Sequence, residues 1–450
     1  MKQRIAQTLL PTLLLALVLG LPAGAQRNIL TREQAQADMD TLYRSIRDIH
    51  PDLFAVYPGR KFGREFRAIR DGLPDTLSVA EFYRLFAPLV ARLGDGHTQL
   101  GFPLNRLDDN RCLPLLTDIR QSDTALLVQA DFSGAPDSIP QGARIRRING
   151  LDAGQLLMQM VQPLSGEKFF HRMAVLNNRF GIMLAVLYPA ARYTIDYEYG
   201  GKTHSAVREK VPPEVFFPAC ARQGESLFRP DFTFDILPGN VGLIGYNNCP
   251  GPEAVRPFLD SVFRIVARQR IADLIIDVRR NSGGNSQTSD EFFQYISPRP
   301  FVQFGATVVK ISDTFTRLGG EQPWKYKHRN GTYRTGKKKP IPLRDNPLRY
   351  SGRCHLLTSH STFSSGADFA WTFHYFRMGK VVGEETGGMV VSFGDALTFR
   401  LPHSGLSASV SFKKFRGYGA KKNAIHGVIP DYAVPEAEAL DYVLKRLVGK

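Results

Sequence analysis

The chain has 450 residues, 43% of them hydrophobic, and exceeds the ~250–300 residues at which a single core stops growing, so two or three domains are expected. Charged residues make up 22% of the chain and aromatic residues 11%, which excludes wholesale disorder. The formal net charge is +16, but the basic residues are spread out, and their densest cluster, Lys337 to Lys339, is short and has no interleaved aromatic residues. A nucleic-acid partner is therefore not expected.

The first 25 residues are typical of a signal peptide. Lys2 and Arg4 give a positive start, residues 9–21 form an apolar run, and residues 23–25 are the small residues that a signal peptidase recognises. The run is shorter than the ~20 apolar residues that span a membrane. We therefore expect an exported chain, periplasmic or extracellular, with no transmembrane segment after cleavage; an uncleaved N-terminal anchor is the alternative. No pattern indicates an oligomeric state.

Residues 30–104 are predicted to form a helical N-terminal domain. Thr31, with Gln34 three residues later, is a helix-start signal, and the His50-Pro51 step should end the first long helix. A second helical pattern places apolar residues on one face at Phe82, Leu85, Leu89 and Leu93. The helical part of this domain should end in the turn at 94–96.

Residues 105–235 change to a β-rich pattern. Strands are predicted at 125–128 and 144–148, and a hairpin at 193–201. Asn149-Gly150 is a turn signal, and an amphipathic helix should follow it.

From residue 236 to 450 strands alternate with helices, which indicates parallel βαβ units. The predicted strands are 241–248, 273–278, 354–359 and 380–385, and the predicted helices are 253–270 and 365–376. Residues 313–350 are polar and rich in Gly and Pro, which is typical of a surface loop or flap.

Four segments carry residue types that suit acyl transfer. His97 follows a Gly-rich turn, where a side chain can face a cleft. Gly283 and Gly284 follow an apolar strand, so their N–H groups could hold a developing oxyanion. Ser364 and Ser365 lie where a strand turns into a helix, next to N–H groups that favour negative charge. The fourth segment joins "VVGEETGG" with "HGVIPD". Taken separately, each segment also fits an ordinary turn or helix cap.

The combination and order of these segments resemble the tail-specific (C-terminal processing) peptidase family. The resemblance rests on "DGHT", "RRNSGG", "TFSSGA", "VGEETGG" and "GVIPD", spread over residues 93–431. It implies an α+β multidomain fold with a helical N-terminal domain at 30–104, a PDZ-like region at 105–235 and a crotonase/ClpP-like α/β core at 236–450. It also implies a serine-type peptidase acting on peptides or unfolded proteins, without a metal or an organic cofactor.

The family uses two catalytic arrangements, and the sequence favours one of them. In the Ser–Lys arrangement a Lys stands 25 residues after the Ser, but Met389 occupies that position and cannot accept a proton. The chain therefore resembles the tricorn-core-like branch, in which the His of D-G-H-T is the base. The resemblance makes Ser364 the nucleophile, His97 the general base, and the N–H groups of Ser365 and of Gly283 or Gly284 the oxyanion hole.

Two positions depart from the family pattern. The Glu of the nucleophile turn is Ala367, and the Glu that orients the site in the tricorn-like branch is Ala424. Candidates to orient His97 in its place are Asn423, Asp95 and Glu384. The alternative function is a catalytically impaired, peptide-binding homologue of the same fold, which the Ala at position 424 favours.

Overall fold

The computed structural model describes residues 29–103, 111–222, 229–320, 329–335 and 339–449. The predicted signal peptide lies outside these residues, as do Lys337 and Lys338 of the basic cluster. Within the described residues, no helix is long and apolar enough to cross a membrane.

Three helices open the described chain: α1 (Arg32–Ile49), α2 (Gly59–Asp71) and α3 (Val79–Ala91). The short strands β1 (Ile29–Thr31) and β2 (Thr76–Ser78) pair beside them. Thr31 and Ser78 each begin a helix with a capping box, which satisfies N–H groups that have no partner inside the helix. α1 ends at the residue before the His50-Pro51 step, as predicted. The predicted apolar face of α3 was wrong at Leu85, which is exposed, whereas Phe82 and Leu89 are buried.

The middle region is an antiparallel sheet with helices packed against it. Its strands are β4 (Leu115–Arg120), β5 (Ala125–Asp131), β6 (Arg144–Ile148), β7 (Leu151–Asp152), β8 (Arg192–Tyr199) and β9 (Lys202–Glu209). They follow the order β4-β5-β6-β8-β9, and β7 pairs with β6. Its helices are α4 (Ala153–Met160), α5 (Phe169–Asn177), α6 (Phe180–Leu187) and α7 (Pro213–Arg222). The predicted strands, hairpin and helix after the Asn149-Gly150 turn are all present.

The α/β core is built on a six-stranded sheet. Its strands are β10 (Phe232–Leu237), β11 (Val241–Tyr246), β12 (Asp273–Asp277), β15 (Arg353–Thr358), β16 (Lys380–Gly383) and β19 (Tyr432–Ala433), in that order. β10 is antiparallel to β11, and the other neighbours are parallel, as the βαβ pattern predicted. Helices α8 (Pro252–Gln269), α9 (Gln287–Ile296), α11 (Ser365–Tyr375) and α12 (Ala439–Arg446) and the turn η4 (Glu436–Glu438) complete it.

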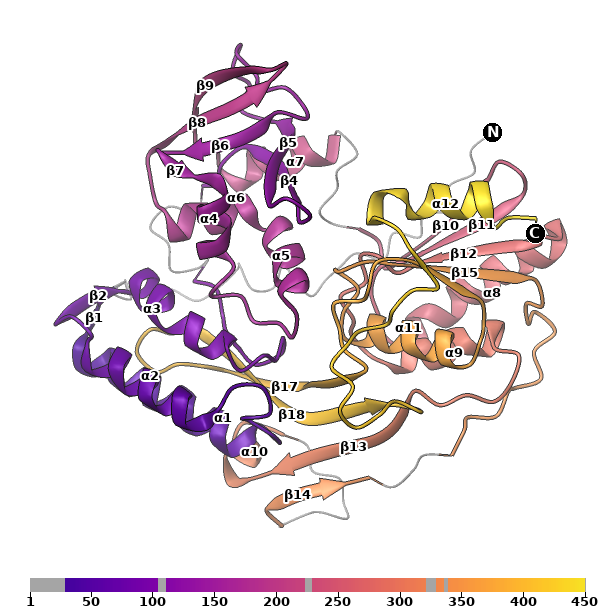
Figure 1. Cartoon of the computed structure of the whole chain (residues 1–450). Helices are drawn as coiled ribbons and strands as arrows, with labels where there is room; N and C mark the ends of the chain where they lie inside the picture. Colours follow the sequence, from indigo (N-terminus) through magenta and orange to yellow (C-terminus); the bar gives the residue numbers. More distant parts are fainter. Residues whose placement is uncertain (1–28, 104–110, 223–228, 321–328, 336–338, 450) are drawn as a thin grey trace.

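A second, antiparallel sheet was not predicted. It contains β14 (Gly331–Arg334), β13 (Phe304–Ile311), β18 (Ser407–Gly417) and β17 (Val391–Arg400), in that order, with β3 (Gln99–Leu100) paired to β18. β14 and α10 (Asp313–Arg317) lie in the stretch that was predicted to be a loop, which is a correction to that prediction. β17 and β18 run between the N-terminal helices and the α/β core (Figure 1).

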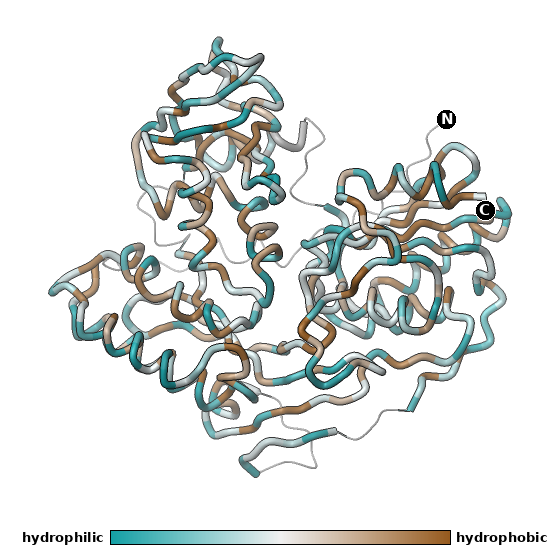
Figure 2. Tube along the Cα trace, viewed as in Figure 1, coloured by the Kyte–Doolittle hydropathy of each residue, from teal (hydrophilic) through white to brown (hydrophobic). Residues whose placement is uncertain are grey.

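The buried side chains form two main cores. One is continuous across the N-terminal helices and the middle region, and includes Phe86 of α3 and Leu184 of α6. The other fills the α/β domain around β12 and α11. Figure 2 shows hydrophobic segments in the N-terminal helices, in the middle region and in the α/β domain. Because they share one continuous core, the N-terminal helices and the middle region stabilise each other instead of folding around separate cores.

Candidate active site

The proposed nucleophile lies on a constrained turn between β15 and α11. Ser364 has φ 51° and ψ −129°, a positive φ that is uncommon for a residue with a side chain. The turn is held by neighbouring strand ends, because Phe363 N–H donates to Asn281 O at 2.9 Å and Thr362 Oγ1 donates to Val278 O at 2.8 Å. Such outliers persist only where the surroundings enforce them, and they concentrate at functional sites.

His97 reaches this turn from the N-terminal domain. Its Nε2 lies 3.0 Å from Ser364 Oγ, although 267 residues separate the two in the sequence. The loop is anchored to β18: Ser409 Oγ donates to His97 O at 2.8 Å, and Ser411 N–H donates to Thr98 Oγ1 at 3.1 Å. The predicted contact between the His and the Ser is confirmed, and its length suits proton transfer.

The glycines after β12 pack against Ser364. A Cβ on Gly283 would lie 2.6 Å from Ser364 Cβ, so only glycine fits there. The Gly283 N–H already donates to Asn281 Oδ1 at 2.8 Å, and Gly283 O accepts from Cys249 N–H at 3.0 Å. A trans peptide directs its N–H opposite to its C=O, so the Gly284 N–H points away from Cys249.

Of the two glycines predicted to donate to an oxyanion, the geometry favours Gly284. Within the part of the chain that the structure describes, the N–H groups of Gly284 and Ser365 have no hydrogen-bond acceptor. Ser365 Oγ donates to Gly284 O at 2.7 Å and ties the two loops together. Two unpaired N–H groups on tied loops beside a serine form the arrangement that oxyanion stabilisation needs.

Buried Asp95 controls the charge of His97. Its Oδ1 accepts from the His97 N–H at 2.9 Å, and its Oδ2 lies 3.2 Å from His50 Nε2. Burial opposes the ionisation of Asp95, but the hydrogen bonds with His50 and His97 outweigh it and hold the pKa of Asp95 well below its usual range. Burial likewise opposes a charge on His97, yet Asp95, with the charges of Glu167 and Asp368, raises the pKa of His97 above its ordinary value. A general base must become an imidazolium during the reaction, and these acidic neighbours stabilise that charged form of His97.

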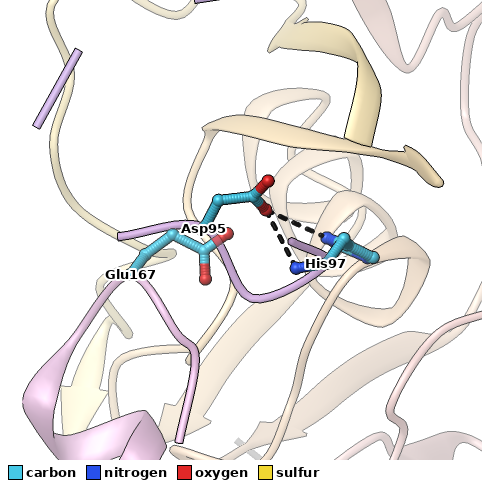
Figure 3. A group of neighbouring side chains, drawn as sticks. All are labelled: Asp95, His97 and Glu167. Atoms are coloured by element: carbon cyan, nitrogen blue, oxygen red, sulfur yellow. Dashed lines mark hydrogen bonds and ion pairs between the residues drawn. The ribbon is translucent and has the colours of Figure 1, made fainter. Parts of the chain in front are cut away.

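Glu167 is a site residue that the sequence analysis missed. It lies in the loop before α5, and neither of its buried carboxylate oxygens has a hydrogen-bond partner among the described residues. Burial, then the charge of Asp95, raises the pKa of Glu167 to about 7. Figure 3 shows its carboxyl group gathered with Asp95 and His97. No motif surrounds Glu167 in the sequence, so only the fold could reveal it.

These three side chains also offer ligand atoms within 4.8 Å of one another, a spacing at which a cation could be considered. Both oxygens of Asp95 are already engaged, one by the His97 N–H and the other by His50. The cluster is therefore better described as an acid–base site, and no metal is assigned to it.

The other two candidate orienting residues lie elsewhere. Glu384 Oε2 accepts from the His360 N–H at 3.2 Å, and Oε1 accepts from the Glu436 N–H at 3.3 Å, so this carboxylate serves a neighbouring turn. Asn423 is exposed and has no contact with His97 among the described residues. Ala424 packs against the hydrophobic core of the α/β domain. Of the three candidates, only Asp95 contacts His97.

Comparison with known proteins finds a peptidase family that resembles the α/β part of the chain. Residues 240–434 match the model described as peptidase family S41. This part of the chain is similar to the S41 peptidases, which are serine-type hydrolases.

Solved structures share the same mixed α/β multidomain fold. Mature CPAF is similar with a TM-score of 0.66 and 14% identity, over 92% of this chain and 97% of that one. Mature CPAF complexed with lactacystin is similar with a TM-score of 0.65 and 13% identity, over the same shares of the two chains. At such low identity this likeness concerns the fold alone.

Asp368 lies on α11 beside the site, and its raised pKa can be tested through the pH dependence of stability. Burial raises the pKa of Asp368 to about 7, although His97 opposes the shift. Because the folded state favours the neutral acid, the stability that Asp368 contributes is present below pH ~4 and is lost as the pH rises towards ~7. We expect Asp368→Asn to raise the free energy of unfolding at pH 8 by on the order of 1–3 kcal/mol, and by little at pH 4.

Denaturant unfolding at both pH values measures this difference. The matched control is Asp441→Asn, which removes an exposed carboxylate paired with Lys445 on α12 and should change stability by less than about 0.5 kcal/mol. An Asp368→Asn variant that is equally stabilised, or equally destabilised, at both pH values would contradict the assignment.

Proposed function

We propose that the protein is an exported serine endopeptidase in which Ser364 is the nucleophile and His97 is the general base. The observation that carries the proposal is the 3.0 Å contact between His97 Nε2 and Ser364 Oγ on a constrained turn. His97 takes the proton of Ser364 as Oγ attacks the peptide carbonyl, and then returns it to the leaving amine. Water hydrolyses the acyl-enzyme by the reverse path.

The N–H groups of Ser365 and Gly284 stabilise the tetrahedral oxyanion in this mechanism. Both lack an acceptor within the described chain, and Ser365 is the first residue of α11, where the helix dipole also favours negative charge. Asp95 stabilises the imidazolium, because its Oδ1 lies 3.8 Å from His97 Nδ1. The chain's own residues thus supply the acid–base, nucleophilic and electrostatic parts of the reaction.

Three finer features belong to the same proposal. Met389 in place of a Lys favours the tricorn-core-like branch with a His base. The middle region would act as a PDZ-like peptide-binding unit, and the α/β core would be of the crotonase/ClpP type. Residues 1–25 have the pattern of a cleaved signal peptide, which supports export. The alternative, an impaired peptide-binding homologue, is less favoured because the Ser–His contact and two unpaired N–H groups are all retained.

A fluorophosphonate probe tests the catalytic pair directly. We expect the wild-type protein to be labelled, and Ser364→Ala to abolish labelling because the attacking oxygen is gone. His97→Ala should slow labelling at least about 100-fold, the scale of a general base. Ser365→Ala keeps the backbone N–H and is the matched control, so it should still label. Labelling that survives Ser364→Ala and disappears in Ser365→Ala would place the nucleophile at the neighbouring residue.

A basic cavity indicates which peptides the site prefers. The cavity has a volume of about 220 Å³ and is lined by apolar residues of β13 and β17 and by four cations: Arg334, Lys414, Arg416 and Lys422. Lys414 pairs with Asp52, whereas the other three have no ion-pair partner within the described residues. β17 starts three residues after Gly388, where a Cβ would lie 2.9 Å from Ser364 N. Val391, which lines the cavity, thus lies within about 10 Å of Gly388 along the chain.

We expect peptides with Asp or Glu two or three residues from the cleaved bond to be hydrolysed faster than matched Asn or Gln peptides. Arg416→Glu should lower kcat/KM for the acidic peptide about 10-fold or more, because the substrate would then meet a like charge. Arg446→Glu, on the exposed surface of α12, is the matched control and should change little. Equal kcat/KM values for acidic and neutral peptides would refute the preference.

A further inference from the structure

We propose that Glu167, contributed by the middle region, is a positioning residue that holds the imidazole of His97 for its work as a base. The proposal rests on the proposed function, in which His97 Nε2 accepts the proton of Ser364. It goes further because no motif recognised in the sequence includes Glu167. The juxtaposition of unpaired buried groups around His97 points to it.

The second ring nitrogen of His97 lacks a hydrogen bond. His97 Nδ1 is buried without a partner in the part of the chain that the structure describes. The nearest Asp95 oxygen lies 3.8 Å away, beyond hydrogen-bond length, and already accepts from the His97 N–H. Both oxygens of Glu167 are buried without a geometrically good hydrogen bond among the described residues, and one ligand atom of each of the three side chains lies within 4.8 Å of the others. Buried polar groups usually have a hydrogen-bond partner, so the neighbouring His97 Nδ1 and Glu167 carboxyl group need a functional explanation.

The chain is shaped to let this carboxyl group approach. A Cβ on Gly96 would lie 3.2 Å from Glu167 Oε2 and 2.6 Å from the Phe363 ring, so a larger residue before His97 would crowd both. Figure 3 shows Glu167 entering from a different loop than Asp95 and His97. Glycine at position 96 thus makes room for an acid that comes from another region of the molecule.

The residues after Glu167 fasten its loop to the nucleophile turn. His171 Nδ1 lies 2.9 Å from His360 O and donates to it, because a carbonyl oxygen can only accept. The His171 ring stacks on Phe363 at 4.4 Å, and Phe363 stacks on His97 at 4.9 Å, so Phe363 lies between the two imidazoles. Burial lowers the pKa of His171 to about 4, so this ring stays neutral and does not compete for the Glu167 carboxylate.

A carboxylate at this place would act on the tautomer and orientation of His97. In the proposed arrangement the Glu167 carboxylate accepts the Nδ1–H of His97, which leaves the Nε2 lone pair facing Ser364. When Nε2 takes the Ser364 proton, the imidazolium is stabilised by the charged groups that face it, Asp95, Glu167 and Asp368. Glu167 takes no proton itself, and the proton passes from Ser364 to His97 and on to the leaving amine.

The test compares Glu167→Gln with wild type by fluorophosphonate labelling and by peptide hydrolysis across pH. Gln has the same size and needs no charge in a buried place, so we expect the folded protein to be at least as stable as wild type. Labelling and kcat should fall about 10-fold with KM nearly unchanged. Removing the Glu167 charge should lower the pKa of His97, so the acid limb of the pH–rate profile should move to lower pH. Glu167→Asp should recover part of the rate.

Two controls separate this inference from the proposed function. Lys168→Gln alters the same loop next to Glu167 and should leave both the rate and the pH midpoint unchanged. If wild type labels, His97→Ala prevents it, and Glu167→Gln labels at the wild-type rate with the same pH midpoint, Glu167 is not a positioning residue and the Ser–His mechanism stands. A wild-type protein that does not label at all would overturn the proposed function itself.

Discussion

The pairing of β3 with β18 is the contact on which the site depends. Leu100 and Gln99 pair with Ala408 and Ser409. On β18, the Ser409 hydroxyl donates to His97 O and the Ser411 N–H donates to Thr98 Oγ1. His97 belongs to the N-terminal helical domain and Ser364 to the α/β core, so without this pairing nothing in the local sequence would bring them together. The antiparallel sheet is a bridge between domains, and its register sets the distance between the two reacting side chains.

Around this contact the protein concentrates buried acids. Asp95 stays ionised because His50 and the His97 loop hydrogen-bond to it, whereas burial raises the pKa values of Glu167 and Asp368 to about 7. Carboxyl groups in one small volume thus have very different proton affinities, and the difference arises from hydrogen bonding instead of residue type. Such divergence is common where acid–base chemistry is carried out, although structural networks also produce it.

The sequence predicted local features well and long-range ones poorly. The capping signal at Thr31 and the buried runs of β12 and β15 depend on neighbours in the chain, and these elements formed where expected. The antiparallel sheet was missed because its central pairing, between β13 and β18, spans more than one hundred residues, and because β14 lies in a polar stretch. Motif order brought out Ser364 and His97, but nothing in the sequence marked Glu167. The sequence analysis also missed that the Gly283 N–H donates to Asn281 Oδ1 and is therefore not free to bind an oxyanion.

The position of β18 in the chain also governs when the site can exist. Ser409 and Ser411, which hold the His97 loop, follow most of the polypeptide in order of synthesis. A chain that is still emerging from the ribosome has the nucleophile turn about 45 residues before it has the strand that presents the base. Hydrolytic competence therefore comes late in synthesis, and an unfinished chain that lacks β18 cannot use His97 as its base.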